Sequence, residues 1–337
     1  MKKIPFKKVL IIRVGAIGDV VHTSNTYRAI KDAHPDVEIH YLTCIDKSMI
    51  EHDPALARVW TIDYKFKAFS KYTLDYAKEL KQENFDAVIN LQPSFKTQWL
   101  ALLAGVKKHF NYRKNNKHAV TNYWETAKRA FPDIKEFDDL KLHLCEDVCV
   151  QMRDRLSGYK RPFVILNGGN VFAKRQGRTY PASMWVELGN KIQEKYDGTI
   201  FITGIKVDAE VLKPLEQIKN SVSFVDKLSF EENSALIKNS DLLVSGDSGP
   251  LHIAAALDVD CVGLFGSMPI ARTGPYGKTC RVVLSPKECA PCNHRACKYL
   301  KKSKNLYAPC MEAIETDAVM AEISNFDNHL FKSKEQV

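Results

Sequence analysis

Short runs rich in apolar and β-branched residues alternate with stretches of helical periodicity, and this alternation constrains the fold more than any other feature. In the first half the predicted strands cover residues 8–14, 37–43, 59–64 and 86–92. In the second half they cover residues 163–167, 199–203, 222–226, 242–245 and 261–265. Alternating strands and helices are typical of parallel sheets with helical crossovers. The sequence therefore predicts two α/β units in tandem.

The length of 337 residues exceeds the size at which one hydrophobic core usually keeps growing, so two domains are expected. The helical stretch that begins near Leu140 is interrupted by Ser157-Gly158 and by Pro162. We therefore predict an N-terminal domain over residues 1–158 and a C-terminal domain over residues 159–337. Residues 316–330 are predicted to form a last helix, and periodicity leaves open whether it packs back on the N-terminal domain.

Composition narrows the class of protein. With 45% hydrophobic and 26% charged residues the chain matches ordinary globular proteins. Its longest apolar runs are far shorter than the roughly 20 residues that span a bilayer. Arg13 interrupts the first apolar stretch and no small-residue cleavage site follows, which argues against a signal peptide. A cytoplasmic protein is expected.

The net charge of +9 favours anionic partners through long-range attraction. A phosphorylated lipid surface, a nucleotide-sugar and a nucleic acid all carry the matching charge. The lysine and arginine clusters lack the aromatic spacing of nucleic-acid modules, so no nucleic-acid partner is expected.

The segment Gly15-Ala16-Ile17-Gly18-Asp19 directly follows the first predicted strand and opens a helix. Its glycines allow the backbone to approach a ligand at the carboxyl end of a sheet. The segment is not a complete G-x-G-x-x-G fingerprint, which argues against a nicotinamide or flavin cofactor. The alternative is that Asp19 simply caps a helix over residues 19–33.

A second turn, at residues 245–249, ends another strand and leads into a helix with Pro250 in its first turn. Free N–H groups and the positive dipole end of such a helix suit a diphosphate, while Asp247 is placed to accept hydrogen bonds from sugar hydroxyls. The alternative is plain capping by Asp247 or Ser248, with His252 as a packed helix residue.

Four segments together carry a family resemblance: Gly18-Asp19-Val20-Val21-His22-Thr23, Gly246-Asp247-Ser248-Gly249-Pro250-Leu251-His252, Phe265-Gly266 and Thr273-Gly274-Pro275-Tyr276-Gly277. They resemble glycosyltransferase family nine, the ADP-heptose:lipopolysaccharide heptosyltransferases, over nearly the whole chain. The resemblance implies the GT-B architecture, in which two Rossmann-like domains face a central cleft. It also implies an acceptor on the N-terminal half, a nucleotide-sugar on the C-terminal half, and inversion at the anomeric carbon with no metal or other cofactor required.

The resemblance also assigns roles to residues. Asp19 matches the catalytic base, and a carboxylate suits the task of taking a proton from the attacking hydroxyl. Gly18 and His22 lie beside it on the acceptor side. The implied donor-binding residues are Asn167, Gly168, Lys174, Arg178, Asp208, Leu228, Asp247, Ser248, Gly249 and His252. Among these, Asp208 corresponds to a position near the ribose and Leu228 to one near the adenine, whereas a surface carboxylate and a core leucine are the alternatives.

One element departs from the family pattern. Many relatives carry a Lys-x-Trp-Pro-like element, whereas this chain has Arg178-Thr179-Tyr180-Pro181, with Lys174 and Arg175 just before it. We expect Arg178 to take the lysine's place, since its planar fork can clamp a phosphate. The alternative is a solvated basic loop.

Four of the nine cysteines gather late in the chain, at Cys289, Cys292, Cys297 and Cys310. A disulfide framework is not expected in a cytoplasmic protein. The C-x2-C spacing of the first pair is that of metal knuckles, and four thiolates can hold Zn or Fe tetrahedrally in a structural site. Some relatives carry a similar cysteine-rich segment. Reduced, empty thiols are the alternative.

The resemblance implies transfer of heptose from ADP-heptose to the inner core of lipopolysaccharide. The acceptor is then an anionic lipid-linked oligosaccharide, met through peripheral contact with the inner membrane face. The alternatives are a family member that uses another nucleotide-sugar or glycosylates a protein, and a non-catalytic nucleotide-binding protein. Asp19 argues against the last, since a decayed enzyme has no reason to keep a carboxylate at that turn.

Overall fold

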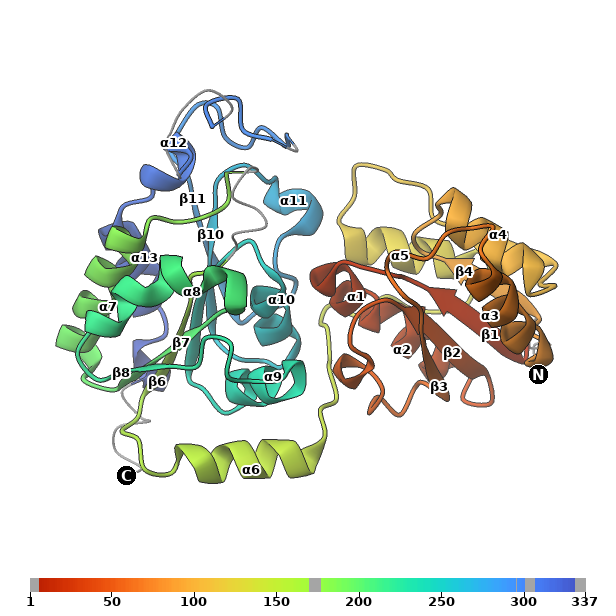
Figure 1. The fold of residues 1–337 in the computed structure, drawn as a ribbon, viewed down its shortest axis with the longest axis horizontal. Coiled ribbons are helices and arrows are strands. Elements are labelled where there is room, and N and C mark those ends of the chain that lie inside the picture. The colour runs from red at the N-terminus through yellow and green to blue at the C-terminus, as the bar shows by residue number, and fades with distance from the viewer. Residues whose placement is uncertain (1–5, 170–176, 295, 301–306, 331–337) are drawn as a thin grey trace. The chain divides into compact units, whose positions relative to one another are not determined.

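The computed structural model describes residues 6–169, 177–294, 296–300 and 307–330. Contacts between Cα atoms divide the chain into two compact units, Met1–Leu144 and Cys145–Val337 (Figure 1). Each unit is built around its own parallel sheet.

Unit 1 holds a five-stranded sheet in the order β3-β2-β1-β4-β5, with every neighbouring pair parallel. Its strands are β1 (Lys8–Ile12), β2 (Glu38–Thr43), β3 (Arg58–Thr61), β4 (Ala87–Asn90) and β5 (Lys108–Asn111). The four predicted strands are confirmed. The sequence did not predict β5, because this edge strand is only partly buried and begins with Lys108, directly after another lysine, Lys107.

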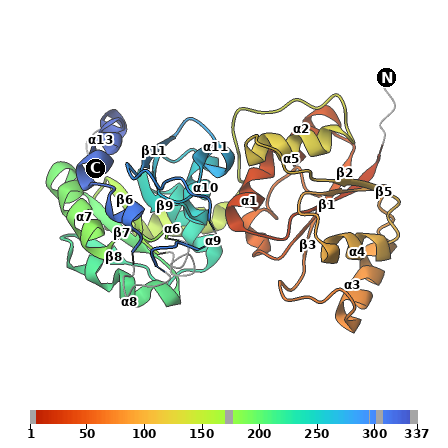
Figure 2. The same cartoon turned by 90° about the horizontal axis from the view of Figure 1, so that it is seen from above.

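Helices cover both faces of this sheet, α2 and α5 on one face and α3 and α4 on the other (Figure 2). Their bounds are α1 (Ile17–His22), α2 (Ser24–Ala33), α3 (Lys71–Gln82), α4 (Phe95–Leu103) and α5 (Ala119–Lys128), with a 3-10 turn at Lys47–Met49. A sheet covered on both faces requires strands that are apolar throughout, and residues 9–12 of β1 are fully buried. Leu10 and Ile12 share one cluster with Leu80 of α3 and Leu100 of α4.

Unit 2 holds a six-stranded parallel sheet in the order β11-β10-β9-β6-β7-β8. Its strands are β6 (Phe163–Asn167), β7 (Thr199–Thr203), β8 (Ser221–Ser223), β9 (Leu242–Gly246), β10 (Cys261–Phe265) and β11 (Cys280–Leu284). Counted within the unit, this is the doubly wound order 3-2-1-4-5-6 of dinucleotide-binding folds. Five strands were predicted, and β11 was not.

The helices of unit 2 are α6 (Glu146–Leu156), α7 (Ala182–Tyr196), α8 (Ala209–Leu212), α9 (Phe230–Lys238), α10 (Gly249–Ala256), α11 (Ile270–Thr273), α12 (Pro309–Glu312) and α13 (Thr316–Ser324), with 3-10 turns at Lys206–Asp208 and Lys213–Gln217. Local sequence fixes several starts. Helix α9, for example, begins with a capping box in which the Ser229 hydroxyl accepts from Glu232 N–H and the Glu232 carboxylate accepts from Ser229 N–H.

Helix α6 and the last helix both pack within unit 2. Asn239, just after α9, donates through Nδ2 to the carbonyl of Cys149 in α6 at 3.1 Å. The units therefore divide before α6, whereas the sequence placed the boundary after residue 158. Helix α13 lies against α7, where Lys191 Nζ is 2.6 Å from Asp317 Oδ1, so the described part of the C-terminal segment packs on its own unit.

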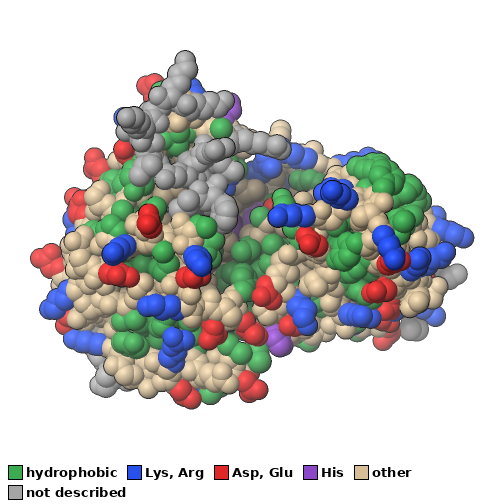
Figure 3. Space-filling view, in the orientation of Figure 1, with side chains coloured by type: hydrophobic (Ala, Val, Ile, Leu, Met, Phe, Trp, Pro, Cys, Tyr) green, Lys and Arg blue, Asp and Glu red, His purple; other side chains and the backbone are tan. Residues whose placement is uncertain are grey.

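Charged side chains of both signs are spread over the face shown in Figure 3. Among the described residues, no helix combines the length and the apolar character needed to cross a bilayer.

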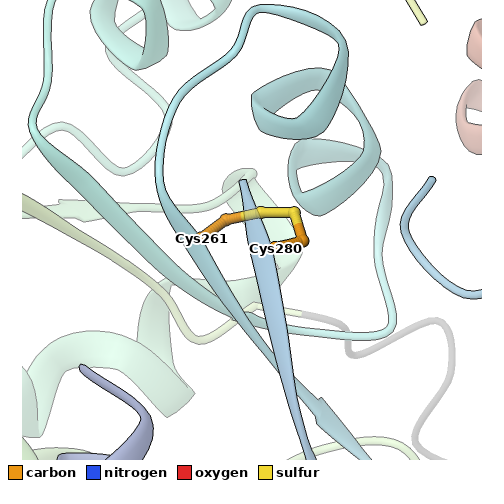
Figure 4. The surroundings of a disulfide bond; sticks show 2 residues. All are labelled: Cys261 and Cys280. Carbon is orange, nitrogen blue, oxygen red and sulfur yellow. A yellow bond between two sulfur atoms is a disulfide. The ribbon is translucent and has the colours of Figure 1, made fainter. Parts of the chain in front are cut away.

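Cys261 and Cys280 form a disulfide between β10 and β11 (Figure 4). The two residues are direct partners in the parallel register of these strands, with Cα atoms 4.6 Å apart. No disulfide framework was expected from the sequence, and this bond between two of the other five cysteines contradicts that expectation. The error follows from missing β11, since only that strand brings Cys280 beside Cys261.

Candidate active site

Asp19 lies in the first turn of α1, immediately after β1 at the carboxyl edge of the unit 1 sheet. Its carboxylate forms an ion pair with the guanidinium of Arg13, and Oδ1 accepts a hydrogen bond of 2.9 Å from the hydroxyl of Tyr123 in α5. About a quarter of the side chain, 27%, remains exposed. The residue at the N-cap is Ala16, so the alternative of Asp19 as a plain cap is wrong. The single predicted helix over residues 19–33 is in fact two, α1 and α2.

Arg13 and Tyr123 hold this carboxylate from two sides. Arg13 Nη1 donates to the carbonyl of Leu91 at 3.0 Å, and its guanidinium lies 5.4 Å from the centre of the Tyr123 ring. Burial, the largest influence, raises the pKa of Tyr123 well above its ordinary value. The phenol therefore stays protonated and remains a donor to Asp19 at physiological pH.

The turn that carries Asp19 sits where strand order reverses between β1 and β4, the usual ligand-binding point of such sheets. Gly15 N–H donates to Gln92 Oε1, which follows β4, at 3.1 Å, so the two strand ends are joined. Gly18 is half-buried. His22 is only 1% exposed and its ring packs edge to face against His118, so its ring lies in the interior of unit 1.

In unit 2 the corresponding reversal lies between β6 and β9, and Asn167 occupies it. Its Nδ2 donates to Thr203 Oγ1 at 3.0 Å, while its Oδ1 accepts from Ser245 Oγ at 3.2 Å and from Ser248 Oγ at 3.4 Å. The side-chain amide of Asn167 therefore joins the ends of β6, β7 and β9 through hydrogen bonds. These bonds fix the backbone at the point where strand order reverses.

Helix α10 begins at this junction. Ser248 is its N-cap residue, but the hydroxyl bonds to Ser245 Oγ at 2.7 Å and makes no cap to the helix. The alternative of ordinary side-chain capping is thus not what the structure shows for Ser248. Gly249 and Pro250 follow in the first turn, and His252 is buried one turn in. The N-terminus of α10 carries no side-chain cap and is a suitable place for an anion.

Arg178 and Asp247 pair with each other, Nη1 to Oδ2, at 2.9 Å. The sequence assigned the guanidinium to phosphate and the carboxylate to sugar without foreseeing this contact. A Cβ added to Gly246 would lie 3.3 Å from the carbonyl of Arg178, which shows how closely the two segments approach. The ion pair is mostly shielded from solvent and stands beside the N-terminus of α10.

Asp208 is buried in a 3-10 turn after β7, and its Oδ2 accepts from Ile205 N–H at 3.2 Å. A Cβ on Gly169 would lie 2.3 Å from the same oxygen, so this loop requires glycine there. A Cβ on Gly168 would lie 2.8 Å from Leu212 Cδ2 and 2.9 Å from Trp185 Nε1, so neighbouring side chains would have to move there as well. Leu228 is half-buried just before α9. Lys174 lies outside the described residues.

The four late cysteines line a single cavity of about 210 Å³, together with His294. Burial, followed by the nearby Cys289, Cys297 and Cys292 thiols, raises the pKa of Cys310 to about 11. Among the described residues, these four sulfur atoms do not all lie within 4.8 Å of one another. The cysteines are therefore gathered, but not as tightly as the ligands of a formed metal site.

Sequence reasoning missed Arg13, Gln92 and Tyr123. Arg13 carried a usable signal: a charged residue that ends a buried apolar strand needs a partner. Tyr123 lies 104 residues beyond Asp19, and no local pattern connects them.

Residues 73–303, more than half of the chain, match the sequence model described as Glycosyltransferase family 9 (heptosyltransferase). The chain belongs to glycosyltransferase family 9. This family-9 chain is 23% identical over 299 residues to the lipopolysaccharide core heptosyltransferase OpsX of Haemophilus influenzae, covering 82% of this chain and 84% of that protein.

Solved structures show the same fold. A family 9 glycosyltransferase from Veillonella parvula superposes with a TM-score of 0.80 at 20% identity, covering 97% of each chain. The Escherichia coli heptosyltransferase WaaC with ADP-2-deoxy-2-fluoro heptose gives a TM-score of 0.69 at 18% identity, covering 94% of this chain and 99% of that one. The predicted GT-B architecture of two Rossmann-like domains is thus confirmed, and the chain is a glycosyltransferase.

Proposed function

We propose that this family 9 glycosyltransferase moves heptose from ADP-heptose to the inner core of lipopolysaccharide, with inversion at the anomeric carbon. The observation that carries the proposal is Asp19, a partly exposed carboxylate held between Arg13 and Tyr123 at the strand-order reversal of unit 1. Support also comes from the relative OpsX, a lipopolysaccharide core heptosyltransferase, and from WaaC, solved with an ADP-heptose analogue.

In the proposed reaction Asp19 is the base. It takes the proton from an acceptor hydroxyl as that oxygen attacks the anomeric carbon of the donor. The bond between this carbon and the β-phosphate oxygen breaks, and ADP leaves with the electron pair. One in-line displacement inverts the centre. Gly18 and His22 are assigned to the acceptor side because both lie in α1, the helix that carries Asp19. Gly18 is in its first turn, and the packing of His22 helps to position the helix.

Unit 2 is proposed to hold the donor. The N-terminus of α10, with Ser248 and Gly249, faces the diphosphate, and Arg178 neutralises its charge. Asp247 accepts hydrogen bonds from sugar hydroxyls. Gly168 and Asn167 shape the adjoining loop, Lys174 adds positive charge, and His252 packs behind the helix start. Asp208 is proposed to face the ribose and Leu228 the adenine.

The ion pair between Arg178 and Asp247 fixes both side chains in the protein without ligand. A diphosphate draws the guanidinium toward itself, because two negative phosphates offer more charge than one carboxylate. The Asp247 carboxylate then accepts hydrogen bonds from the sugar hydroxyls. Because the positive charge comes from protein groups, the proposed transfer step needs no metal.

The cysteine cavity is proposed to be a structural metal site for Zn or Fe. Thiolates are preferred ligands of both metals. Metal binding displaces the thiol protons, and the four cysteines line one cavity from which they can supply thiolates to a single ion. The cysteines belong to unit 2 and the proposed base to unit 1, so the proposed role of the metal is stability.

The proposed acceptor is an anionic lipid-linked oligosaccharide at the inner membrane face, reached by peripheral contact. The net charge of +9 supports this partner. One observation favours a second candidate, a family member with another nucleotide-sugar or a protein acceptor, namely Arg178 in place of the usual lysine. Incubating the protein with a panel of nucleotide-sugars and heptose-deficient lipopolysaccharide, followed by mass analysis, tests both. A heptose adduct from ADP-heptose alone supports the first, and no product from any donor contradicts both.

A further inference from the structure

The surface of unit 1 formed by the loop before α3 and by α4 exposes a group of large apolar side chains. We call Phe69, Phe95, Trp99 and Leu102 the aromatic patch. Phe69, Phe95 and Leu102 are 69%, 64% and 60% exposed. The Phe69 ring lies 5.8 Å from that of Phe95 and 5.3 Å from that of Trp99, while Phe95 and Trp99 stack at 6.4 Å. Figure 3 shows hydrophobic side chains gathered over α4.

The fold does not need this arrangement. The buried face of α4 is satisfied by Leu100 and Ala101, which are fully buried in the core. Phe95 is instead the first residue of the helix, set facing outward by the capping box of Ser94 and Thr97. A shallow cavity of about 640 Å³, lined by Phe95, Trp99 and Leu102 among others, adjoins the rings. Rings that stack on each other in solvent form a prearranged apolar surface, and such surfaces mark interaction sites.

Exposed lysines accompany the aromatic patch, and one of them, Lys107, lines the same cavity as Phe95, Trp99 and Leu102. Five exposed lysines lie in the loop before α3, in α3 and α4, and in the loop after α4: Lys65, Lys67, Lys71, Lys96 and Lys107. Lys96 Nζ lies 5.3 Å from the ring of Phe66. The loop and α3 also carry three acids, Asp63, Asp75 and Glu79, of which Asp75 is paired with Lys78. Aromatic side chains ringed by lysine are typical of surfaces that lie in the headgroup region of an anionic bilayer, with the rings in the apolar layer and the ammonium groups at the phosphates.

Two residues of the aromatic patch, Phe69 and Phe95, lie at the sheet edge that carries the proposed base. Phe69 is in the loop that follows β3, and Phe95 comes soon after the carboxyl end of β4. Asp19 follows the carboxyl end of β1, and Gln92 of the β4 loop is hydrogen-bonded to Gly15 of the Asp19 turn. Because all strands of this sheet are parallel, these loops share one edge.

We propose that the aromatic patch is a membrane-contact surface that inserts its rings into an anionic phospholipid bilayer. The inference rests on the proposed function, since a lipid-linked acceptor presents its sugars at that bilayer. Contact through α4 holds the edge bearing Asp19 at the plane where those sugars emerge.

Binding to vesicles tests the surface directly. The variant F69S/F95S/L102S removes the apolar side chains, and L284S removes an equally exposed leucine from unit 2 as the matched control. Cosedimentation is measured with vesicles of phosphatidylcholine containing about a third of phosphatidylglycerol. We expect the triple variant to bind at least about tenfold more weakly and L284S to bind as the wild type does. Equal binding by the triple variant, or no binding by the wild type, overturns the proposal.

Charge is tested separately. The variant K67Q/K96Q/K107Q should lose affinity for the anionic vesicles, by about fivefold per lysine, and the wild type should bind pure phosphatidylcholine more weakly. Sedimentation velocity without lipid checks the competing occupant, a second copy of the chain. A wild-type oligomer that the triple variant disrupts, with vesicle binding unchanged, assigns the surface to self-association and overturns the membrane proposal.

A third measurement separates this inference from the proposed function. Transfer to a delipidated, water-soluble core oligosaccharide should be unchanged in the triple variant, because the aromatic patch does not contact the reacting groups. Loss of that transfer in a variant of unchanged Tm overturns a pure membrane role. If the wild type binds anionic vesicles through the patch but transfers no heptose, the proposed function fails while the surface assignment holds.

Discussion

Arg178 Nη1 lies 2.9 Å from Asp247 Oδ2, so the two side chains proposed to grip opposite parts of the donor are paired before it arrives. Because of this pairing, replacing Arg178 and replacing Asp247 should affect donor binding differently. Removing the arginine leaves a buried carboxylate without its cation, whereas removing the aspartate frees a cation that still favours phosphate.

Asp247→Ala is expected to weaken binding of ADP-heptose by about tenfold or more while leaving ADP binding unchanged or tighter, because its proposed partners are sugar hydroxyls. Arg178→Ala should weaken both ligands. Isothermal calorimetry on the two variants and the double variant measures this. Equal losses for ADP and ADP-heptose in Asp247→Ala would contradict the assignment.

Asp19→Asn is expected to lower the transfer rate by roughly 10²–10⁴-fold with ADP affinity nearly unchanged, since an amide cannot accept the acceptor's proton. Asp36→Asn, an exposed aspartate in the loop before β2, is the matched control and should behave as the wild type. Single-turnover rates decide the point, and near-normal turnover in Asp19→Asn removes that residue from the mechanism.

Tyr123→Phe deletes only the hydroxyl that donates to Asp19. Losing one hydrogen bond to a charged acceptor should lower kcat by about tenfold, with KM for the donor unchanged, because the ring and its contact with Arg13 remain. A change in donor KM with kcat intact would place Tyr123 in donor binding instead.

Three buried tyrosines of unit 1 make stability fall at alkaline pH. Burial raises the pKa values of Tyr27, Tyr41 and Tyr123 above the ordinary value near 10. Above about pH 10 the unfolded chain releases these protons while the folded chain keeps them, so the free energy of unfolding decreases as pH rises. Absorbance titration of tyrosinate should show these phenols ionising only together with the loss of circular dichroism. Full ionisation with native dichroism intact would show that the three side chains are not buried.

Protein purified under reducing conditions without chelator should carry about one equivalent of Zn or Fe, and Cys310→Ser should lose it, with a lower Tm but unchanged turnover per folded molecule. Cys44→Ser, a half-buried thiol of unit 1, is the control. Less than about a tenth of an equivalent in the wild type would contradict the metal site, since structural thiolate sites bind zinc with apparent free energies of roughly 10–16 kcal/mol.

Periodicity predicted the central strands of both sheets because such strands are apolar throughout. It failed at β5 and β11, edge strands whose exposed positions carry polar residues such as Lys108 and Arg281. Because β11 was not predicted, the disulfide between Cys261 and Cys280 was not predicted either. At the candidate site, turns after strands indicated Asp19 and Asp247 as candidates, because a chain-local pattern suffices there. Their partners were not predicted: Arg13 and Tyr123 were missed, and Arg178 was assigned to phosphate and not to Asp247. Contacts between distant segments depend on the full fold.

The hydrogen bonds of Asn167 limit which residues can replace it. Its amide donates to Thr203 on one side and accepts from Ser245 and Ser248 on the other. Aspartate would set a second acceptor against the Thr203 carbonyl, which lies 3.4 Å from Nδ2, and leucine would satisfy neither side. Replacing it would loosen β7, β9 and the start of α10 together, so one side chain decides whether unit 2 presents a fixed surface to the proposed donor.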